Sequence, residues 1–272
     1  MKISDCPLCF SRKKQIVRTQ TFKDDYLDLI DRSYQSAVRQ IVTCQDCGFT
    51  YRDPSLDKND LEVLYAHFRD ISFRNETPDQ YFDRITGLAA KESENSAKVQ
   101  WLKARIPKRL ANPGNILDIG CGGGVFLHSF SKSFPNWNLH GVEPTSSFAE
   151  LAARRLGETV IDGSYQSKMF NTKFDLITMI QVLEHVISPV DFLLDVANDL
   201  TPSGLVYLEV PDIKDLDFLP DNHDRFHMQH LSIFSKDSLK RTCLKAGYKI
   251  EAIDQSITIR GKNNLNALLS RQ

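Results

Sequence analysis

Two cysteine pairs near the N-terminus have the spacing of a metal site. Cys6-Pro7-Leu8-Cys9 and Cys44-Gln45-Asp46-Cys47 each form a CxxC turn, and residues 10–43 separate them. Two such turns supply four thiolates to a tetrahedral ion, and Gly48 permits the tight turn of the second pair. We therefore predict a structural Zn²⁺ site. Iron in the same cage is the alternative, and a redox pair is disfavoured because neither pair follows a strand of a βαβ unit.

A glycine-rich turn, Gly120-Cys121-Gly122-Gly123-Gly124, follows the apolar segment 116–119. A strand that runs into such a turn and then a helix brings the backbone close to a ligand. The dinucleotide fingerprint requires its third glycine where this chain has Val125, and it normally has no acid in the strand. A nicotinamide cofactor is therefore disfavoured. Asp118, two residues before the first glycine, suits a ligand with a cationic amino group.

The histidines are candidates for a general base. His185 follows an apolar strand segment, and His223, His227 and His230 cluster further along the chain, where they would arch over the same mouth. A well-placed base contributes about 10² to 10⁴ in rate. The i+4 and i+3 spacing of the cluster also suits a metal face, and His185 alone also suits a cap or a satisfied core position.

The composition is that of a globular protein with a formal charge of −1 over 272 residues. A net charge this close to zero provides no overall electrostatic attraction to phosphates, which most nucleic-acid binders use. We expect no secretory signal, because the first residues lack an apolar stretch, and the richest apolar run, residues 174–186, is interrupted by polar residues and too short to span a membrane. We expect a cytoplasmic protein with reduced cysteines.

Three stretches with different patterns must position these groups. Residues 1–54 show no sustained helical or strand period and are predicted to form a small zinc-binding module. Residues 55–112 are predicted to be a helical connecting segment, with helices at 61–68 and within 78–106, that helps to form the acceptor site. Residues 113–272 alternate short strands and helices, which predicts an α/β domain with a mostly parallel sheet covered on both faces.

The predicted elements of that domain follow one another in β-α order. Strands are expected at 116–119, 139–142, 159–161, 174–180 and 205–210, and helices at 125–131, 146–155, 189–200 and 236–246. Segments 249–253, 256–259 and 264–269 are expected to be edge strands. Open α/β sheets bind ligands beyond the carboxyl ends of their strands, where the glycine turn and the acids lie.

These residues resemble class I S-adenosylmethionine-dependent methyltransferases. Asp118, Gly120 and Gly122 match that family's first motif, and Glu143 occupies the place of the acid that accepts the ribose hydroxyls. Further matches are the turn Asp162-Gly163-Ser164 and the run 174–186, which contains the family's Glu-His pair. The resemblance implies a Rossmann-like fold with a seven-stranded sheet and cofactor contacts from Asp118, Gly120, Cys121, Gly122, Glu143, Pro144, Asp162, Gly163, Ile180 and Gln181.

The four-cysteine module and the run His230-Leu231-Ser232-Ile233-Phe234-Ser235 are similar to zinc-containing methyltransferases of sugar and polysaccharide biosynthesis. Only His230 matches the histidine-rich run of the members that methylate carbon, so O-methylation is favoured. Related quinone-pathway O-methyltransferases bind a divalent ion with two acids and a histidine, but the first acid is Gln181 here, which argues against that metal.

The resemblance thus implies an S-adenosylmethionine-dependent O-methyltransferase that acts on a small acceptor, a sugar or glycan precursor, with His230, His185 or His227 as catalytic residues. The alternatives are an RNA base methyltransferase with a zinc module, against which the nearly balanced charge of residues 1–54 argues, and a non-catalytic zinc-binding interaction protein. The basic residues around Trp101 are interpreted as one solvated helix face; a nucleotide or RNA contact is the alternative.

Overall fold

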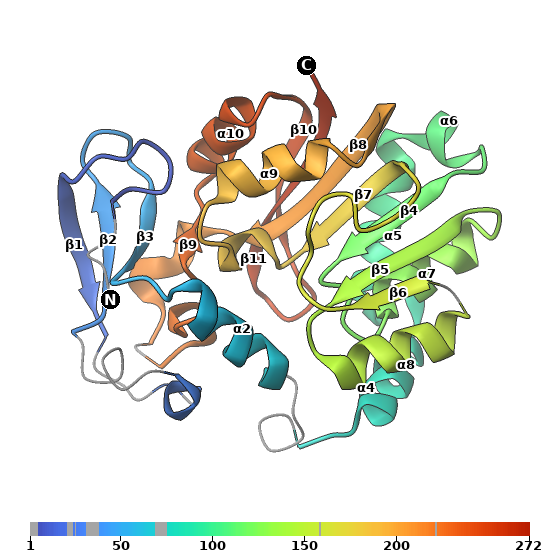
Figure 1. Ribbon diagram of the computed structural model, residues 1–272, viewed down its shortest axis with the longest axis horizontal. Helices are drawn as coiled ribbons and strands as arrows, with labels where there is room; N and C mark the ends of the chain where they lie inside the picture. The colour runs from blue at the N-terminus through green and yellow to red at the C-terminus, as the bar shows by residue number, and fades with distance from the viewer. Residues whose placement is uncertain are drawn as a thin grey trace.

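A computed structural model describes residues 5–20, 24, 26–30, 38–68, 75–157, 159–220 and 222–272 of the chain. Two sheets organise it (Figure 1): a seven-stranded sheet in the order β10-β11-β8-β7-β4-β5-β6 and a four-stranded sheet in the order β1-β2-β3-β9. No helix within the described ranges is both long and apolar enough to cross a membrane.

Five strands of the large sheet are parallel, and an antiparallel hairpin closes one edge. The parallel strands are β4 (Asn115–Ile119), β5 (Asn138–Glu143), β6 (Thr159–Asp162), β7 (Phe174–Ile180) and β8 (Leu200–Pro211). The predicted Rossmann-like, mostly parallel seven-stranded sheet is confirmed. Because parallel strands carry their carboxyl ends to one edge, the ends of β4, β5, β6 and β7 lie together.

The hairpin corrects one expectation about the C-terminal strands. Segments 249–253 and 256–259 form a single strand, β10 (Tyr248–Ile257), which pairs with β11 (Asn263–Arg271). A register shift between Ile250 and Ala252 marks a bulge within this pair. The expectation divided the strand at the polar residues Asp254 and Gln255, which nevertheless pair with Asn266 and Leu265.

Helices cover both faces of the large sheet (Figure 1). On one face α5 (Glu94–Arg105), α7 (Val125–Ser133) and α8 (Ser146–Leu156) pack together, and on the other lie α9 (Pro189–Ala197) and α10 (Lys236–Lys245). Successive residues of β4 serve the two layers, since Ile116 packs with α5 and α7 while Leu117 packs with the α9 and α10 layer.

The helical stretch before β4 is divided into more and shorter helices than the sequence predicts. It contains α2 (Lys58–His67), α4 (Pro78–Thr86), α5 and α6 (Pro107–Leu110), so the expected run 78–106 is two helices. The Thr77 and Gln80 side chains form a capping box for α4, Gly87 ends that helix, and the Ser93 hydroxyl accepts from Ser96 N to begin α5. Capping side chains can begin and end helices even where the apolar residues continue at helical spacing.

The N-terminal residues contain strands that their sequence pattern does not predict. Strands β1 (Lys14–Thr19), β2 (Gln40–Cys44) and β3 (Thr50–Asp53) are antiparallel, and β9 (Ser232–Ile233) joins β3 from the far end of the chain. The edge strand β1 is largely exposed, so it shows no two-residue apolar period. The division of the chain at residues 54 and 112 stays a prediction.

Candidate functional site

Three glycines shape the turn between β4 and α7. Gly120, Gly122 and Gly124 all have positive φ, at 70°, 55° and 77°, and Gly124 is the N-cap of α7. A Cβ built on Gly120 would lie 2.7 Å from Val182 Cγ2. Only glycine tolerates both this backbone conformation and this close contact, so the turn requires glycine at position 120.

Asp118 is a buried carboxylate at the end of β4. Its Oδ1 accepts a hydrogen bond from Thr178 Oγ1 of β7 at 2.6 Å, and the residue is 3% exposed. Burial raises the pKa of Asp118 to about 7, Glu143 adds to the rise, and the Thr178 hydroxyl and Lys98 oppose it. A carboxyl with this pKa becomes ionised when a cationic group approaches.

Glu143, at the end of β5, ties the neighbouring turns together. Its Oε2 accepts from Gly122 N at 2.8 Å and its Oε1 from Thr145 N at 3.0 Å. Thr145 Oγ1 in turn donates to the backbone oxygen of Tyr65 in α2. The carboxylate thus links the glycine turn to the helix that lies over this edge of the sheet.

The other residues predicted to contact a cofactor lie around the same edge. Cys121 is buried, and its Sγ occupies the space that a Cβ on Gly141 would need, which agrees with a packing role. Asp162 pairs in register with Glu143, and Gly163 N donates to Glu143 O. Pro144 and Ile180 follow Glu143 and Met179 directly, so the structure gathers the whole predicted set at the strand ends.

Gln181 belongs to a buried polar group that the sequence does not reveal. It has a positive φ of 57°, its Nε2 donates to Glu209 Oε1 at 3.2 Å, and Lys98 Nζ lies 3.4 Å from Glu209 Oε2. The Lys98 and Glu209 side chains are 8% and 6% exposed. Lysines also flank apolar positions on exposed helices, so the place of Lys98 beside Val99 and Leu102 does not signal its burial.

The basic residues around Trp101 form a solvated face only in part, because Lys103, Arg105 and Lys108 are exposed but the other two are not. Lys98 is buried, Arg105 pairs with Asp254 while its guanidinium lies over the Trp101 ring, and Arg109 pairs with Asp175 at 2.7 Å. These three of the five basic residues are thus paired with acids of the same chain.

A second group forms where η3 (Leu183–His185) follows β7. One ligand atom each from Glu184, His185 and His230 lie within 4.8 Å of one another. His185 Nδ1 lies 2.9 Å from Gln229 O, and His230 Nδ1 lies 3.2 Å from Arg225 O. A carbonyl oxygen only accepts, so each Nδ1 donates, and Nε2 is the atom that carries the lone pair when the ring is neutral. Burial lowers the pKa of His230 well below its usual range.

The carboxyl of Glu184 is buried in this group, and neither of its oxygens has a hydrogen-bond partner within the described part of the chain. Burial raises the pKa of Glu184 to about 8, and Oε1 lies 3.7 Å from His185 Nε2. The buried Tyr65 hydroxyl also has no partner there, and its ring meets the His185 ring edge-on at 5.8 Å. Buried polar atoms of this kind mark a place where a ligand supplies the missing hydrogen bonds.

The predicted histidine cluster is only partly assembled. His230 joins His185 with ring centroids 4.9 Å apart, whereas His227 and His223 belong to no metal-binding group among the described residues. His223 Nδ1 instead accepts from Arg225 N at 3.2 Å and caps a short 3-10 turn. A metal face built from His223, His227 and His230 is therefore not formed there.

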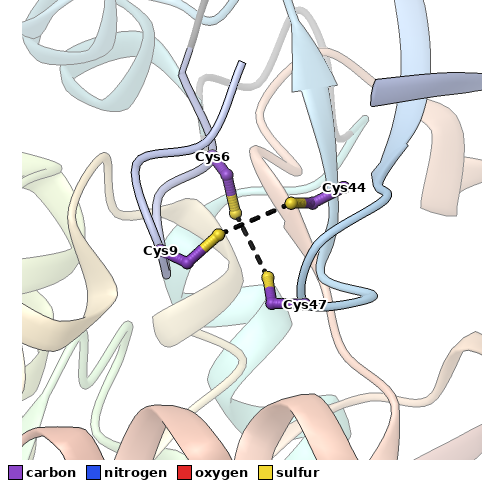
Figure 2. Close-up of side chains that lie close together, drawn as sticks. All are labelled: Cys6, Cys9, Cys44 and Cys47. Atoms are coloured by element: carbon purple, nitrogen blue, oxygen red, sulfur yellow. Dashed lines mark hydrogen bonds between the residues drawn. The ribbon is translucent and has the colours of Figure 1, made fainter. Parts of the chain in front are cut away.

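The four cysteines converge in the small sheet (Figure 2). Cys6 Sγ and Cys47 Sγ are 3.5 Å apart, as are Cys9 Sγ and Cys44 Sγ, and all four sulfur atoms lie within 4.8 Å of one another. With zinc–sulfur bonds of about 2.3 Å a tetrahedron has edges of about 3.8 Å, and a disulfide would need sulfur atoms about 2.05 Å apart. The geometry and the donor set fit a tetrahedral Zn²⁺ with these four ligands.

The sheet topology, the glycine turn after its first parallel strand and the acids at the strand ends define a Rossmann-like methyltransferase fold. The family model for the "Methyltransferase domain" matches residues 92–253, and the chain belongs to this family.

Named relatives share part of the sequence. The chain is 28% identical over 184 residues to the mitochondrial ubiquinone biosynthesis O-methyltransferase of Schizosaccharomyces pombe, which covers 65% of this chain and 62% of the relative. It is 28% identical over 161 residues to the ubiquinone biosynthesis O-methyltransferase of Colwellia psychrerythraea, covering 54% and 65%. The chain thus spans less than two thirds of either relative.

Solved structures support the fold. The plantazolicin methyltransferase BpumL, solved with a substrate analogue and SAH, aligns with 79% of this chain and 98% of its own at a TM-score of 0.57 and 17% identity. The magnesium protoporphyrin IX methyltransferase of Synechocystis PCC 6803, solved with SAH, aligns with 79% and 100% at a TM-score of 0.57 and 14% identity.

Proposed function

We propose that this chain transfers the methyl group of S-adenosylmethionine to a hydroxyl oxygen of a small acceptor. The observation that carries the proposal is the path of residues 181–185. Val182 lies against Gly120 of the glycine turn, and Glu184 and His185 follow directly in the group that includes His230. A candidate cofactor turn and two candidate bases are therefore brought to the same edge of the sheet.

The residues at the strand ends fit the groups of this cofactor. The Asp118 carboxylate is placed to accept hydrogen bonds from an ammonium group, and Glu143, where β5 ends, is placed to accept from ribose hydroxyls. The remaining members of the proposed cofactor set are Gly120, Cys121, Gly122, Pro144, Asp162, Gly163, Ile180 and Gln181. When bound, S-adenosylmethionine supplies a methyl group on a positively charged sulfur.

The protein's part in the chemistry is alignment and proton removal. Alignment of the acceptor oxygen with the methyl group accounts for most of the rate, and a base adds about 10² to 10⁴. As the oxygen–carbon bond forms, the acceptor hydroxyl gives its proton to a histidine Nε2. His230 and His185 both donate from Nδ1 to a backbone oxygen, which leaves Nε2 as the basic atom of each ring, whereas His227 lies outside their group.

The same group favours an acceptor that presents O–H donors. The Nε2 atoms of His185 and His230 offer lone pairs, and the Glu184 oxygens have no partner within the described residues. The named relatives methylate oxygen by their description, which agrees with a hydroxyl acceptor. No relative reported above supports a sugar or glycan acceptor specifically, so the acceptor class is set by the experiment below. A cytoplasmic location stays a prediction.

Zinc has a structural part in this proposal. Cys6, Cys9, Cys44 and Cys47 would hold the ion between two tight turns, where Gly48 has a φ of 72° and Phe10 the equivalent value of 61°. Four thiolates complete a tetrahedral shell, so the ion offers no open position for an acceptor. It would stabilise the small sheet and would not take part in methyl transfer.

The experiment supplies purified protein with methyl-labelled S-adenosylmethionine and a size-fractionated cell extract, with and without ribonuclease. Labelled products are then treated with mild base, because methyl esters are cleaved under conditions that leave ethers intact. The matched control is the Asp118→Asn variant, which retains the shape of the side chain but not its charge.

We expect ribonuclease-resistant, base-stable label in the low-mass fractions, absent with Asp118→Asn. Chromatography of the labelled fraction then separates sugar-containing from phenol-containing acceptors. Label lost with ribonuclease would establish an RNA methyltransferase instead, and base-labile label would establish a carboxyl acceptor. Equal label with wild type and variant would refute the cofactor site.

A further inference from the structure

Arg52 of β3 is an arginine buried in the small sheet, with 1% of its surface exposed. Its guanidinium reaches across to a segment 174 to 178 residues further along the chain. Nη2 donates to Phe226 O at 2.7 Å and to His227 O at 3.0 Å, and Nε donates to His230 O at 3.3 Å. Hydrogen bonds from an ionised donor are about twice as strong as neutral ones, so these bonds fix the backbone of residues 226–230.

The main chain of Arg52 holds the same segment. Arg52 N donates to Leu231 O at 2.9 Å, and the next residues, Ser232 and Ile233, pair with β3 as strand β9. From the opposite side, Leu231 N donates to Glu184 O at 2.9 Å. The segment that carries His230 is therefore held between a strand of the N-terminal sheet and the Glu184-His185 turn of the methyltransferase domain.

We propose that Arg52 is a positioning residue, which fixes residues 226–231 so that the His230 ring is held beside Glu184 and His185. The effect of Arg52 on turnover rests on the proposed function. It also gives the four-cysteine module a role beyond its own folding, because β3 begins three positions after Cys47 and carries Arg52 to the histidine segment. The module thereby forms one wall of the candidate acceptor site.

The side chain at position 52 needs the shape of arginine as well as its charge. Three carbonyl oxygens and the Gln20 side-chain oxygen, 2.6 Å from Nη1, surround the planar guanidinium. Lysine supplies three donors from a single atom and cannot reach acceptors spread over a plane. The conservative Arg52→Lys change should therefore release some of the carbonyls while it keeps the charge in the site.

The test compares Arg52→Lys and Arg52→Met with wild type and with Arg241→Met. Arg241 is exposed, and its Nη1 donates to Cys47 O at 2.7 Å, so the control removes an arginine–carbonyl bond of the same module away from residues 226–231. Hydrogen exchange of peptides covering 222–232, ¹⁵N spectra of labelled histidines and calorimetric binding of S-adenosylhomocysteine are measured for each. The His230→Asn variant assigns the His230 signals.

In wild type we expect the His230 signals of a neutral ring with its proton on Nδ1. In both Arg52 variants we expect at least tenfold faster exchange in 222–232, loss of the single Nδ1–H form, and an S-adenosylhomocysteine Kd within twofold of wild type. The rate of label transfer to the active extract fraction should fall at least tenfold. Arg241→Met should match wild type in 222–232 and in label transfer.

The proposal is overturned by unchanged exchange in 222–232, by exchange that rises equally throughout the sheet, or by a different His230 form in wild type. If Arg52→Met does not fold, Arg52→Lys decides by the same readouts. Exchange and histidine spectra need no acceptor. If wild type transfers no label, the proposed function fails, while these two readouts still decide the role of Arg52.

Discussion

The affinity of the protein for S-adenosylhomocysteine should increase as the pH rises through the range in which Asp118 ionises. In the free protein burial raises the pKa of Asp118 to about 7. An ammonium group of the ligand pairs only with the carboxylate form, so below this pKa binding must first remove a proton. The affinity then depends on pH even though the ligand's own charge does not change over that range.

The magnitude follows from the ionised fraction. With a pKa of about 7, about a tenth of Asp118 is ionised at pH 6 and about nine tenths at pH 8. The Kd should therefore fall about tenfold between these values, which corresponds to about 1.4 kcal/mol, and reach a plateau above pH 8. On a logarithmic plot the slope below pH 7 approaches one proton per ligand.

Calorimetric titrations between pH 5.5 and 8.5 test this expectation. Asp118→Asn should weaken binding by about 2 to 5 kcal/mol, because one partner of a buried pair is removed, and its Kd should not vary with pH. Thr178→Val removes the hydroxyl that lowers the pKa of Asp118, so its midpoint should move to higher pH. A flat wild-type profile, or the same profile in Asp118→Asn, would refute the assignment of Asp118 to the ammonium group.

Ionisation of Asp118 strengthens ligand binding but destabilises the ligand-free protein. Its folded-state pKa of about 7 lies above the ordinary value of 3.8, so the protonated form is favoured by folding. This contribution is fully present below about pH 4 and is lost as the pH rises to about 7. Asp118→Asn should therefore raise the Tm of the free protein at pH 7.5 while it weakens ligand binding, and a lowered Tm would contradict the burial argument.

Three further predictions concern the glycine turn, the base and the metal. Gly120→Ala should lower S-adenosylhomocysteine affinity at least tenfold because the added methyl group meets Val182. Gly157 has a similar φ of 66° but no atom within 4 Å of an added Cβ. Gly157→Ala should therefore lower the free energy of unfolding by about 1 kcal/mol and leave the affinity unchanged. His230→Asn should lower turnover of the labelled acceptor about 10² to 10⁴-fold with S-adenosylhomocysteine affinity within twofold, and equal losses of both would point to a structural role. Cys47→Ser should abolish bound zinc, measured by plasma mass spectrometry, and lower the Tm, whereas Cys243→Ala, outside the cluster, should keep one zinc per chain.

The fold of residues 113–272 could be predicted because each of its strands and helices shows its own pattern of apolar residues in the sequence. Each parallel strand is a short apolar run bounded by turns, and α7 and α8 begin directly after such turns. In the N-terminal residues β2 and β3 bury their apolar side chains against distant parts of the chain, as Ile41 does against Phe226 and Ile233, and β3 pairs with β9. No local pattern encodes a partner strand that lies about 180 residues away.

The same distinction separates the site residues that the sequence predicts from those it does not. Asp118 and Glu143 stand at the ends of recognisable parallel strands, and the sheet itself brings such positions together. Lys98 is buried through a contact with Glu209 on a distant strand, and Tyr65 reaches the Glu184 group only because α2 lies over the sheet edge. Contacts of this kind depend on how elements pack, and a one-dimensional pattern contains little about packing.

His230 shows how both kinds of information are needed for one residue. Its type and its place after β8 make it a candidate base, but three candidates share that stretch of sequence. The structure separates them because Arg52, from the other end of the chain, fixes the backbone carbonyls of residues 226–230, and Arg225 O fixes the Nδ1 proton. A ring nitrogen of His230 then lies within 4.8 Å of ligand atoms of Glu184 and His185, whereas His227 belongs to no such group among the described residues. The lone pair exposed to an acceptor is thus decided by hydrogen bonds to backbone atoms, which the residue types at 223, 227 and 230 do not specify.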